Sequence, residues 1–191
     1  MSIERIGFIG LGIMGEPMAG HLLAAGHTAY LHSRSGVPAA LTAAGGQACG
    51  SPAEVARQAD IIFVMVPDTP DVEKVLFGAG GVAEGLSAGK VVVDMSSISP
   101  VATRDFAARV EAAGARYLDA PVSGGQVGAR NAALTIMVGG PVETFERVLP
   151  LFQKMGKNIT LVGENGAGQI TKVANQIIVA LTIEAVGEAL V

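Results

Sequence analysis

Short apolar runs recur along the whole chain, and segments with helix-start signals separate them. Most of the runs are continuously apolar rather than alternating, which is typical of parallel strands covered on both faces. They lie at residues 5–9, 28–32, 61–66, 91–95, 117–119, 134–138 and 159–162. Strand and helix alternating in this way predict an α/β fold with a doubly wound, mostly parallel sheet.

Proline marks the start of four expected helices. Ser51-Pro52-Ala53-Glu54 is a capping box with proline at the first helical position. Three more helices are expected to open in the same way, at Thr69-Pro70, Ser99-Pro100 and Gly140-Pro141. Three glycines fall just past expected helix ends, where a left-handed residue is favoured: Gly26, Gly78 and Gly114.

A glycine motif, Gly10-x-Gly12-x-x-Gly15, lies between the first expected strand and the first expected helix. With 26 glycines in 191 residues, the bare spacing arises roughly 0.5 times by chance, so its position decides its meaning. At this junction Gly10 permits a tight turn and Gly12 lets a pyrophosphate approach the backbone. Gly15 lets the helix pack close to the sheet, with its amino terminus facing the anion. The alternative is a glycine-rich turn without a ligand.

We therefore predict a Rossmann-type NAD(P)-binding domain over residues 1–163, followed by a long helix within 164–191. The motif assigns cofactor contacts to the residues of the loop: Gly10, Leu11, Gly12, Ile13, Met14 and Gly15.

The second expected strand ends in Ser33-Arg34-Ser35 and has no acidic residue there. An NAD enzyme usually places Asp or Glu at this point to bind the ribose 2′-hydroxyl, whereas an arginine accommodates a 2′-phosphate. Arg34 can pair bidentately with phosphate, and the two serines can donate to it. The prediction is NADP(H) in preference to NAD, and an exposed loop arginine without a ligand is the alternative.

The remaining composition excludes several classes of function. A single cysteine, Cys49, excludes an internal disulfide or a cysteine metal cluster, and the three histidines show no metal-ligand spacing. A net charge of −4 without a basic run argues against nucleic acid. Unbroken apolar stretches such as 61–66 are too short to cross a bilayer, and the amino terminus does not read as a secretory signal. We expect a soluble cytoplasmic protein with no membrane partner.

Four blocks, in order along the chain, resemble the β-hydroxyacid dehydrogenase family: residues 8–21, 94–97, 119–125 and 168–176. The resemblance implies hydride transfer between NAD(P)H and a small carboxylate bearing an aldehyde or β-hydroxyl group. Within this family, segments 65–70 and 175–181 are most similar to members that reduce tartronate semialdehyde to D-glycerate, so the resemblance implies that substrate. The alternatives are 3-hydroxyisobutyrate, succinic semialdehyde and, from another class, a non-catalytic dinucleotide-binding module.

Hydride addition to an aldehyde builds negative charge on oxygen, so a proton donor or cation must lie beside it. Lys172 fits this role as general acid, and Asn175 is positioned to orient the lysine or hold the substrate oxygen. At 100° per residue Lys172, Asn175 and Gln176 share one helix face with Val179 and Ile183. The pattern predicts a wet pocket at one end of a buried helix; a solvated lysine is the alternative.

Two further groups complete the predicted site. Ser123, Gly124 and Gly125 offer a hydroxyl and flexible backbone N–H groups, which suit a substrate carboxylate. Ser97, Val66 and Pro67 follow two expected strands, where the sheet edge meets the nicotinamide end of the cofactor. Asp119, Met18 and His21 are interpreted as structural, and Met14 as a packing residue as well as a loop contact.

The resemblance also implies an all-helical domain after the long helix, which closes the active-site cleft and builds a dimer or tetramer. The chain ends at Glu188-Ala189-Leu190-Val191 with no glycine cap or basic last turn. Residues 164–191 are therefore expected to be the start of an inter-domain helix. The missing part is expected to supply half of the substrate pocket and a further cofactor-contacting lysine.

Overall fold

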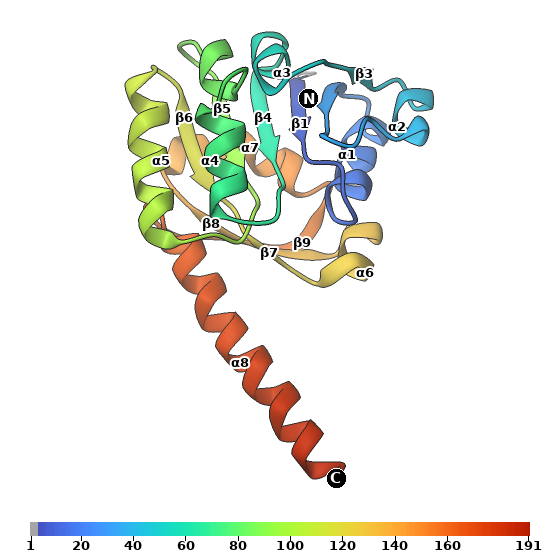
Figure 1. The fold of residues 1–191 in the computed structure, drawn as a ribbon, viewed down its shortest axis with the longest axis vertical. Helices are drawn as coiled ribbons and strands as arrows, with labels where there is room; N and C mark the ends of the chain where they lie inside the picture. The colour runs from blue at the N-terminus through green and yellow to red at the C-terminus, as the bar shows by residue number, and fades with distance from the viewer. Residues whose placement is uncertain (1–3) are drawn as a thin grey trace.

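The apolar runs form one mostly parallel sheet covered by helices in the computed structural model, which describes residues 4–191 (Figure 1). The strand order is β3-β2-β1-β4-β5-β6-β8-β7, and β9 pairs with β8. Strand β8 runs antiparallel to β6 and β7 and parallel to β9, and the other strand pairs within residues 4–191 are parallel. The strands are β1 (Arg5–Ile9), β2 (Thr28–His32), β3 (Gln47–Ala48), β4 (Ile61–Val64), β5 (Val91–Asp94), β6 (Arg116–Asp119), β7 (Val122–Ser123), β8 (Leu134–Gly139) and β9 (Gly156–Gly163). The predicted Rossmann-type sheet is confirmed, with β1 central between β2 and β4.

The predicted helix starts are correct to within a residue, and two short helices, α2 (Ala39–Ala43) and α6 (Gly125–Arg130), were not predicted. The others are α1 (Gly15–Ala24), α3 (Pro52–Gln58), α4 (Thr69–Phe77), α5 (Pro100–Ala112), α7 (Val142–Phe152) and α8 (Ala167–Ala189), with a 3₁₀ turn at Val82–Gly85. Ser51 and Ser99 cap α3 and α5 as expected. Helix α4 begins one residue early because Asp68 Oδ1 accepts from Thr69 N (2.6 Å). Pro141 lies at the N-cap position of α7, one residue before the helix begins, and its side chain makes no capping hydrogen bond.

Gly78 is a correction to the predicted helix ends. Gly26 and Gly114 have φ of 88° and 83° and end their helices in the left-handed conformation. Gly78 has a φ of −69°, so positive φ is not the reason for glycine there. A Cβ at this position would lie 2.5 Å from the carbonyl oxygen of Lys74, so close approach to α4 requires the glycine.

Each face of the sheet carries its own apolar core. Phe8 and Phe63, on neighbouring strands, stack with ring centroids 5.8 Å apart on one face, and Phe152 of α7 meets Phe63 edge-on at 6.2 Å. On the other face Tyr117 and Phe106 pack with the alternate strand residues. Burial on both faces explains why the strands read as continuous apolar runs.

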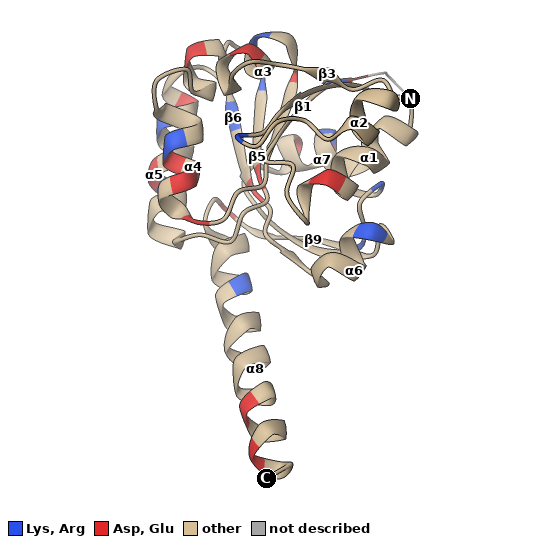
Figure 2. Cartoon of the chain, turned by 45° about the vertical axis from the view of Figure 1, so that its right-hand side comes forward, with Lys and Arg blue, Asp and Glu red and all other residues tan. Residues whose placement is uncertain are grey.

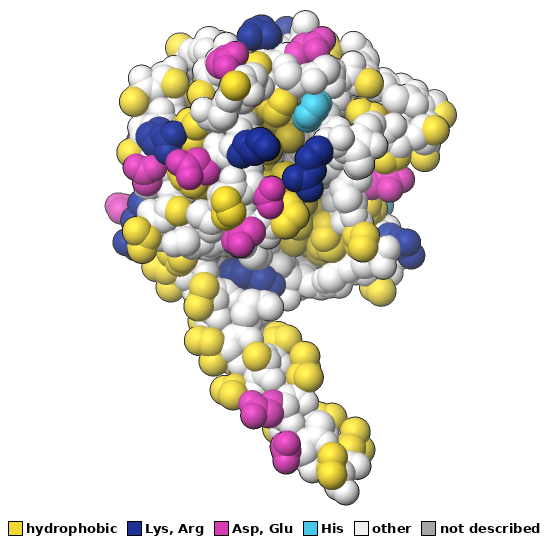
Figure 3. Space-filling model, viewed as in Figure 1, with side chains coloured by type: hydrophobic (Ala, Val, Ile, Leu, Met, Phe, Trp, Pro, Cys, Tyr) yellow, Lys and Arg dark blue, Asp and Glu magenta, His cyan; other side chains and the backbone are white. Residues whose placement is uncertain are grey.

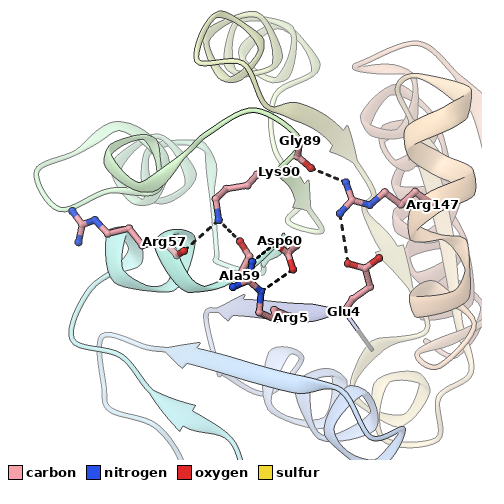
Figure 4. Close-up of polar contacts among 8 residues, drawn as sticks. All are labelled: Glu4, Arg5, Arg57, Ala59, Asp60, Gly89, Lys90 and Arg147. Atoms are coloured by element: carbon pink, nitrogen blue, oxygen red, sulfur yellow. Dashed lines mark hydrogen bonds and ion pairs between the residues drawn. The ribbon is translucent and has the colours of Figure 1, made fainter. Parts of the chain in front are cut away.

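The amino ends of β1, β4 and β5 are held by charged side chains (Figure 4). Arg5 pairs bidentately with Asp60 (2.9 and 2.7 Å), which lowers the pKa of that carboxyl. The ammonium of Lys90 donates to the carbonyl oxygens of Ala59 and Arg57, and burial lowers its pKa. This edge serves stability, and it lies opposite the edge from which α8 departs (Figure 1).

Helix α8 leaves the sheet after its first turn, which corrects the prediction of a buried helix. Within residues 4–191 only Gly168 and Gln169 of α8 are buried. Its large apolar side chains are exposed, from Val179 at 40% to Ile178 and Ile183 at 68% each, and groups of yellow side chains recur along the helix in Figure 3. Figure 2 shows its few charges, Lys172 near the start and Glu184 and Glu188 near the end.

By length and composition alone α8 is apolar enough to cross a membrane, which the unbroken apolar runs of the sequence did not indicate. A helix covered by protein passes the same test, so this observation does not assign a membrane partner. No all-helical domain follows α8 within the part of the chain that the structure describes.

We expect the 191-residue chain, expressed alone, to self-associate. Apolar side chains around the circumference of α8 favour burial on nearly all sides, and the sheet covers only the first turn. Light scattering measures the association, and hydrogen exchange along α8 reports whether it buries the helix. A monodisperse monomer with α8 protected from exchange would contradict this expectation.

Candidate functional site

The carboxyl ends of β1, β2, β4 and β5 are tied together by hydrogen bonds between their loops. Gly10 N donates to the carbonyl of His32 (3.0 Å), and Met65 N donates to that of Ile9 (2.9 Å). Val66 N donates to Oγ of Ser96 (3.1 Å). These contacts bring the predicted glycine loop, the loop after β4 and the loop after β5 to one edge.

The three glycines of the loop have different reasons to be glycine. Gly10 has a φ of 95°, and a Cβ there would collide with the carbonyl of Met65. A Cβ on Gly15 would collide with the carbonyl of Gly10. A Cβ on Gly12 would meet no protein atom within 4 Å. Protein packing therefore explains Gly10 and Gly15, while Gly12 faces open space.

No side chain caps the start of α1, and its N-cap is Met14. The first backbone N–H groups of a helix need partners, and an anion is the usual one at such a terminus. Leu11 is buried under the loop, whereas Ile13 is 68% exposed. Open space at Gly12 beside an uncapped helix start fits a dinucleotide pyrophosphate.

Arg34 extends into solvent after β2, with its side chain 87% exposed. Its Nη1 lies 3.7 Å from Oδ1 of Asp71, on the first turn of α4. Ser33 and Ser35 hydroxyls lie 3.4 Å apart beside it. The guanidinium is free to turn toward a ligand at the cost of a weak, exposed ion pair. Sequence reasoning did not identify Asp71 as its neighbour.

A pocket of about 360 Å³ lies where α8 meets the loop after β5. It contains two predicted site residues, Ser97 and Lys172. Its other lining residues were not predicted as site residues: Ile98, Gln169, Val173, Gln176, Ile177 and Ala180. Gln176 shares the helix face of Lys172, which was the available signal. Gln169 lies three residues before Lys172 on the same helix, and Ile98 reaches the pocket through a tertiary contact.

Lys172 is half-buried, and burial lowers the pKa of its ammonium below the ordinary lysine value. A cation whose pKa moves toward neutrality becomes a better proton donor. Asn175 does not contact Lys172 here: its Nδ2 donates to Oε1 of Gln176 (3.2 Å), and it does not line the pocket. The predicted pairing of Asn175 with the lysine is thus absent from residues 4–191.

Ser123, Gly124 and Gly125 lie apart from the lining of this pocket. Ser123 ends β7 opposite Thr135, and the two glycines turn into α6 with φ of 130° and 57°. Both glycines are exposed.

His21, interpreted as structural, contacts the carbonyl of Ala129 through Nε2 (2.9 Å) and joins α1 to α6. Val66 is half-buried and Pro67 is exposed on the loop after β4.

A buried acid lies directly beneath the loop after β5. Asp94 is fully buried, and burial raises its pKa to about 6. Its Oδ1 accepts from Ser96 N (3.0 Å), and its Oδ2 accepts from the hydroxyl of Tyr117 (3.0 Å). The carboxyl holds the turn that leads to Ser97.

Relative to the wild type, the Asp94→Asn variant is expected to be more stable at neutral pH than at pH 4. The raised pKa means that the stabilising contribution of Asp94 is full below about pH 4 and is lost as the pH rises through about 6. An amide carries no charge: its oxygen can still accept from Ser96 N, and its nitrogen can donate to the hydroxyl oxygen of Tyr117. The variant therefore gains on the order of 3 kcal/mol on the wild type between pH 4 and 7.5. Urea unfolding at both pH values measures the difference.

Asp60→Asn provides the control of opposite sign. Its pKa is lowered by Arg5, so Asp60 contributes stability above its ordinary pKa and loses it as the pH falls. The Asp60→Asn variant should therefore lose more unfolding free energy, relative to the wild type, at neutral pH than at acid pH. If the difference in the free energy of unfolding between the wild type and Asp94→Asn does not change with pH, the interpretation of Asp94 is contradicted.

Comparison with known proteins adds to this geometry. A sequence profile of the NAD binding domain of 6-phosphogluconate dehydrogenase matches residues 5–163. The chain is 57% identical to 2-hydroxy-3-oxopropionate reductase of Escherichia coli (strain K12), over 97% of the chain and 64% of that protein. The chain thus spans less than two thirds of the length of this relative.

Solved structures share the fold at similar coverage. Mycobacterium tuberculosis 3-hydroxyisobutyrate dehydrogenase with L-serine matches with a TM-score of 0.88 and 35% identity, over 98% of the chain and 64% of that protein. Psf3 in complex with NADP⁺ and 2-OPP matches with a TM-score of 0.86 and 29% identity, over 97% and 67%. The profile match, the relatives and the shared fold agree with the resemblance of the four sequence blocks. The chain belongs to the β-hydroxyacid dehydrogenase family.

Proposed function

We propose that the whole protein reduces tartronate semialdehyde (2-hydroxy-3-oxopropanoate) to D-glycerate with NADPH, and that Lys172 is the general acid. The observation that carries the proposal is the pocket that Ser97 and Lys172 line together. It lies on the sheet edge that also holds the open Gly12 loop. A dinucleotide bound along this edge would join the two sites.

The glycine loop and the first turn of α1 would hold the pyrophosphate, and Arg34 with Ser33 and Ser35 would hold the 2′-phosphate. The dinucleotide, when bound, supplies the hydride. Val66, Pro67 and Ser97 would line the approach to the pocket. Residues 1–163 then form the NAD(P)-binding domain, and 164–191 begin the inter-domain helix.

Lys172 supplies the proton of the reduction. As hydride reaches the aldehyde carbon, negative charge grows on the oxygen, and the ammonium stabilises it and transfers a proton to it. Burial of Lys172 weakens its hold on that proton. Asn175 would position the substrate or lysine once the pocket is complete, and Ser123, Gly124 and Gly125 would receive the carboxylate. We assign these last roles on the family resemblance.

The identity to the Escherichia coli reductase supports tartronate semialdehyde as the substrate. The likeness to 3-hydroxyisobutyrate dehydrogenase supports 3-hydroxyisobutyrate as the second candidate. Steady-state kinetics of the whole protein with tartronate, succinic and methylmalonate semialdehydes, each with NADPH and NADH, tests the choice. A higher kcat/KM for another semialdehyde overturns the proposed substrate, and no turnover with any of them favours a non-catalytic binding module.

Gly12→Val is expected to weaken dinucleotide binding at least about tenfold while leaving the fold intact. The new side chain enters space that no protein atom occupies, so stability should change by less than about 0.5 kcal/mol. The same space is where the pyrophosphate approaches the backbone. Isothermal titration of NADPH measures the loss.

Gly20→Ala is the matched control on α1. A Cβ there meets only Leu41 at 3.7 Å, an ordinary contact, and alanine favours the helix by roughly 0.5–1 kcal/mol. This variant should bind NADPH like the wild type and unfold at higher denaturant concentration. Equal affinities of wild type and Gly12→Val would place the pyrophosphate elsewhere.

A further inference from the structure

Gln169 joins the two walls of the pocket that holds Lys172. It lies in the first turn of α8 and is 1% exposed. Its Oε1 accepts from Ile98 N (3.1 Å), and its Nε2 donates to the carbonyl of Ser96 (2.7 Å). These two groups flank Ser97, so one amide side chain holds the loop after β5 on both sides of the pocket residue.

Asp119 fixes the same turn of α8 from below. It is fully buried at the end of β6, and α8 has no side-chain cap of its own at Gly166. Asp119 Oδ1 accepts from Gly166 N (2.8 Å) and Oδ2 from Gln169 N (3.0 Å). A carboxylate in this position accepts from the free N–H groups of the first turn, and its negative charge interacts favourably with the positive end of the helix dipole. A Cβ on Gly168 would lie 2.8 Å from Asp119 Oδ2, so the turn rests directly on the carboxyl.

The first turn is the only buried part of α8, a helix of 23 residues that is about 34 Å long. Its orientation therefore depends on the contacts of this turn, and Gln169 and Asp119 make its buried side-chain hydrogen bonds. Lys172 lies three residues after Gln169, on the neighbouring helix turn, so any tilt at the anchor moves its ammonium relative to Ser97.

We propose that Gln169 is a positioning residue that sets the distance between Lys172 and the loop carrying Ser97, with Asp119 fixing the helix start. The proposal rests on the proposed function, in which Lys172 is the proton donor. Gln169 touches neither reacting atom in this role. It acts through the placement of Lys172.

Gln169→Met in the whole protein removes both hydrogen bonds at similar side-chain length. Single-turnover reduction of tartronate semialdehyde should slow about 10- to 100-fold, because small misplacements of a catalytic group are costly. The Kd for NADPH should change less than about threefold. Lys90→Met is the matched control, since Lys90 also makes two hydrogen bonds to backbone groups, one of them buried, at the opposite edge of the sheet (Figure 4). It should destabilise the protein without slowing the single turnover.

Gln169→Glu adds a second variant that retains the size of the side chain. Protonated, its carboxyl can donate to Ser96 O and accept from Ile98 N; ionised, it repels that carbonyl. The nearby acids Asp94 and Asp119 favour the protonated form, and Lys172, one turn away, opposes it. Relative to wild type at the same pH, its single-turnover rate should rise as the pH falls. A purely structural Gln169 predicts no such rescue and equal rates for Gln169→Met and Lys90→Met.

Hydrogen exchange separates this proposal from the proposed function. Exchange at Ile98 should accelerate in Gln169→Met and stay unchanged in Lys90→Met, whatever the substrate. If the wild type turns over no semialdehyde, the proposed function fails while exchange at Ile98 still tests the anchor. Unchanged exchange at Ile98, or a wild-type single-turnover rate in Gln169→Met, overturns the positioning role.

Discussion

Lys172→Ala in the whole protein is expected to lower kcat for semialdehyde reduction about 10²–10⁴-fold, the usual contribution of a positioned general acid. The variant removes the only charged side chain that lines the pocket with Ser97 among the described residues. NADPH affinity should survive, because the glycine loop and Arg34 do not depend on Lys172. Steady-state kinetics and NADPH titration of the same preparation measure the two effects.

Lys172→Arg separates charge from proton donation. Arginine keeps the cation but holds its proton at every working pH, so it should recover only part of the loss. Burial lowers the pKa of Lys172, so wild-type reduction should decline at alkaline pH, with an apparent pKa below that of ordinary lysine, as the ammonium loses its proton. Full activity in Lys172→Arg would assign the lysine an electrostatic role only.

Arg34→Ala is expected to weaken NADPH binding roughly 10- to 100-fold, which corresponds to about 1.5–3 kcal/mol for a charge-assisted phosphate contact. NADH binding should change little, because it lacks the 2′-phosphate. Isothermal titration of both cofactors into wild type and variant measures the effect. Equal affinities of the wild type for NADPH and NADH would contradict the assignment.

Asp71→Asn sharpens the same test. The carboxylate of Asp71 lies 3.7 Å from Arg34 and competes with a phosphate for the guanidinium. Without it, NADPH should bind a few-fold more tightly, and the difference should shrink as salt screens the exposed charges. Weaker NADPH binding in Asp71→Asn would instead mean that the acid orients the arginine.

The central fold was predictable because its signals are local. Residues 5–9 and 28–32 became β1 and β2 without a change of bounds, since a buried parallel strand is one continuous apolar run. Strands β3 and β7 were missed because each has two residues and no apolar run, so pairing with a neighbour alone defines them. The runs at 61–66 and 91–95 were predicted one or two residues too long because apolar residues continue into the loops.

The site was predictable only where its residues share a local pattern. The glycine loop has a fixed glycine spacing at a strand–helix junction, and Lys172 lies on a polar helix face. The roles of both in binding and catalysis are proposed above. Asp119 was interpreted as structural, but its contacts with α8 and those of Gln169 with the loop after β5 could not be predicted. The partners lie 47 and 50 residues away for Asp119 and 71 and 73 residues away for Gln169. Helix periodicity grouped Asn175 with Lys172, but it does not fix where an amide donates, and Asn175 contacts Gln176.

Single-turnover hydride transfer with NADPH saturating tests the central claim most directly, because it isolates the chemical step from cofactor binding and product release. The whole protein and its Lys172→Ala variant are mixed with tartronate semialdehyde, and NADPH oxidation is followed by absorbance. A rate about 10²–10⁴-fold lower in the variant, at unchanged NADPH affinity, is the predicted result. Turnover of Lys172→Ala at the wild-type rate would show that Lys172 does not donate the proton and would contradict the mechanism.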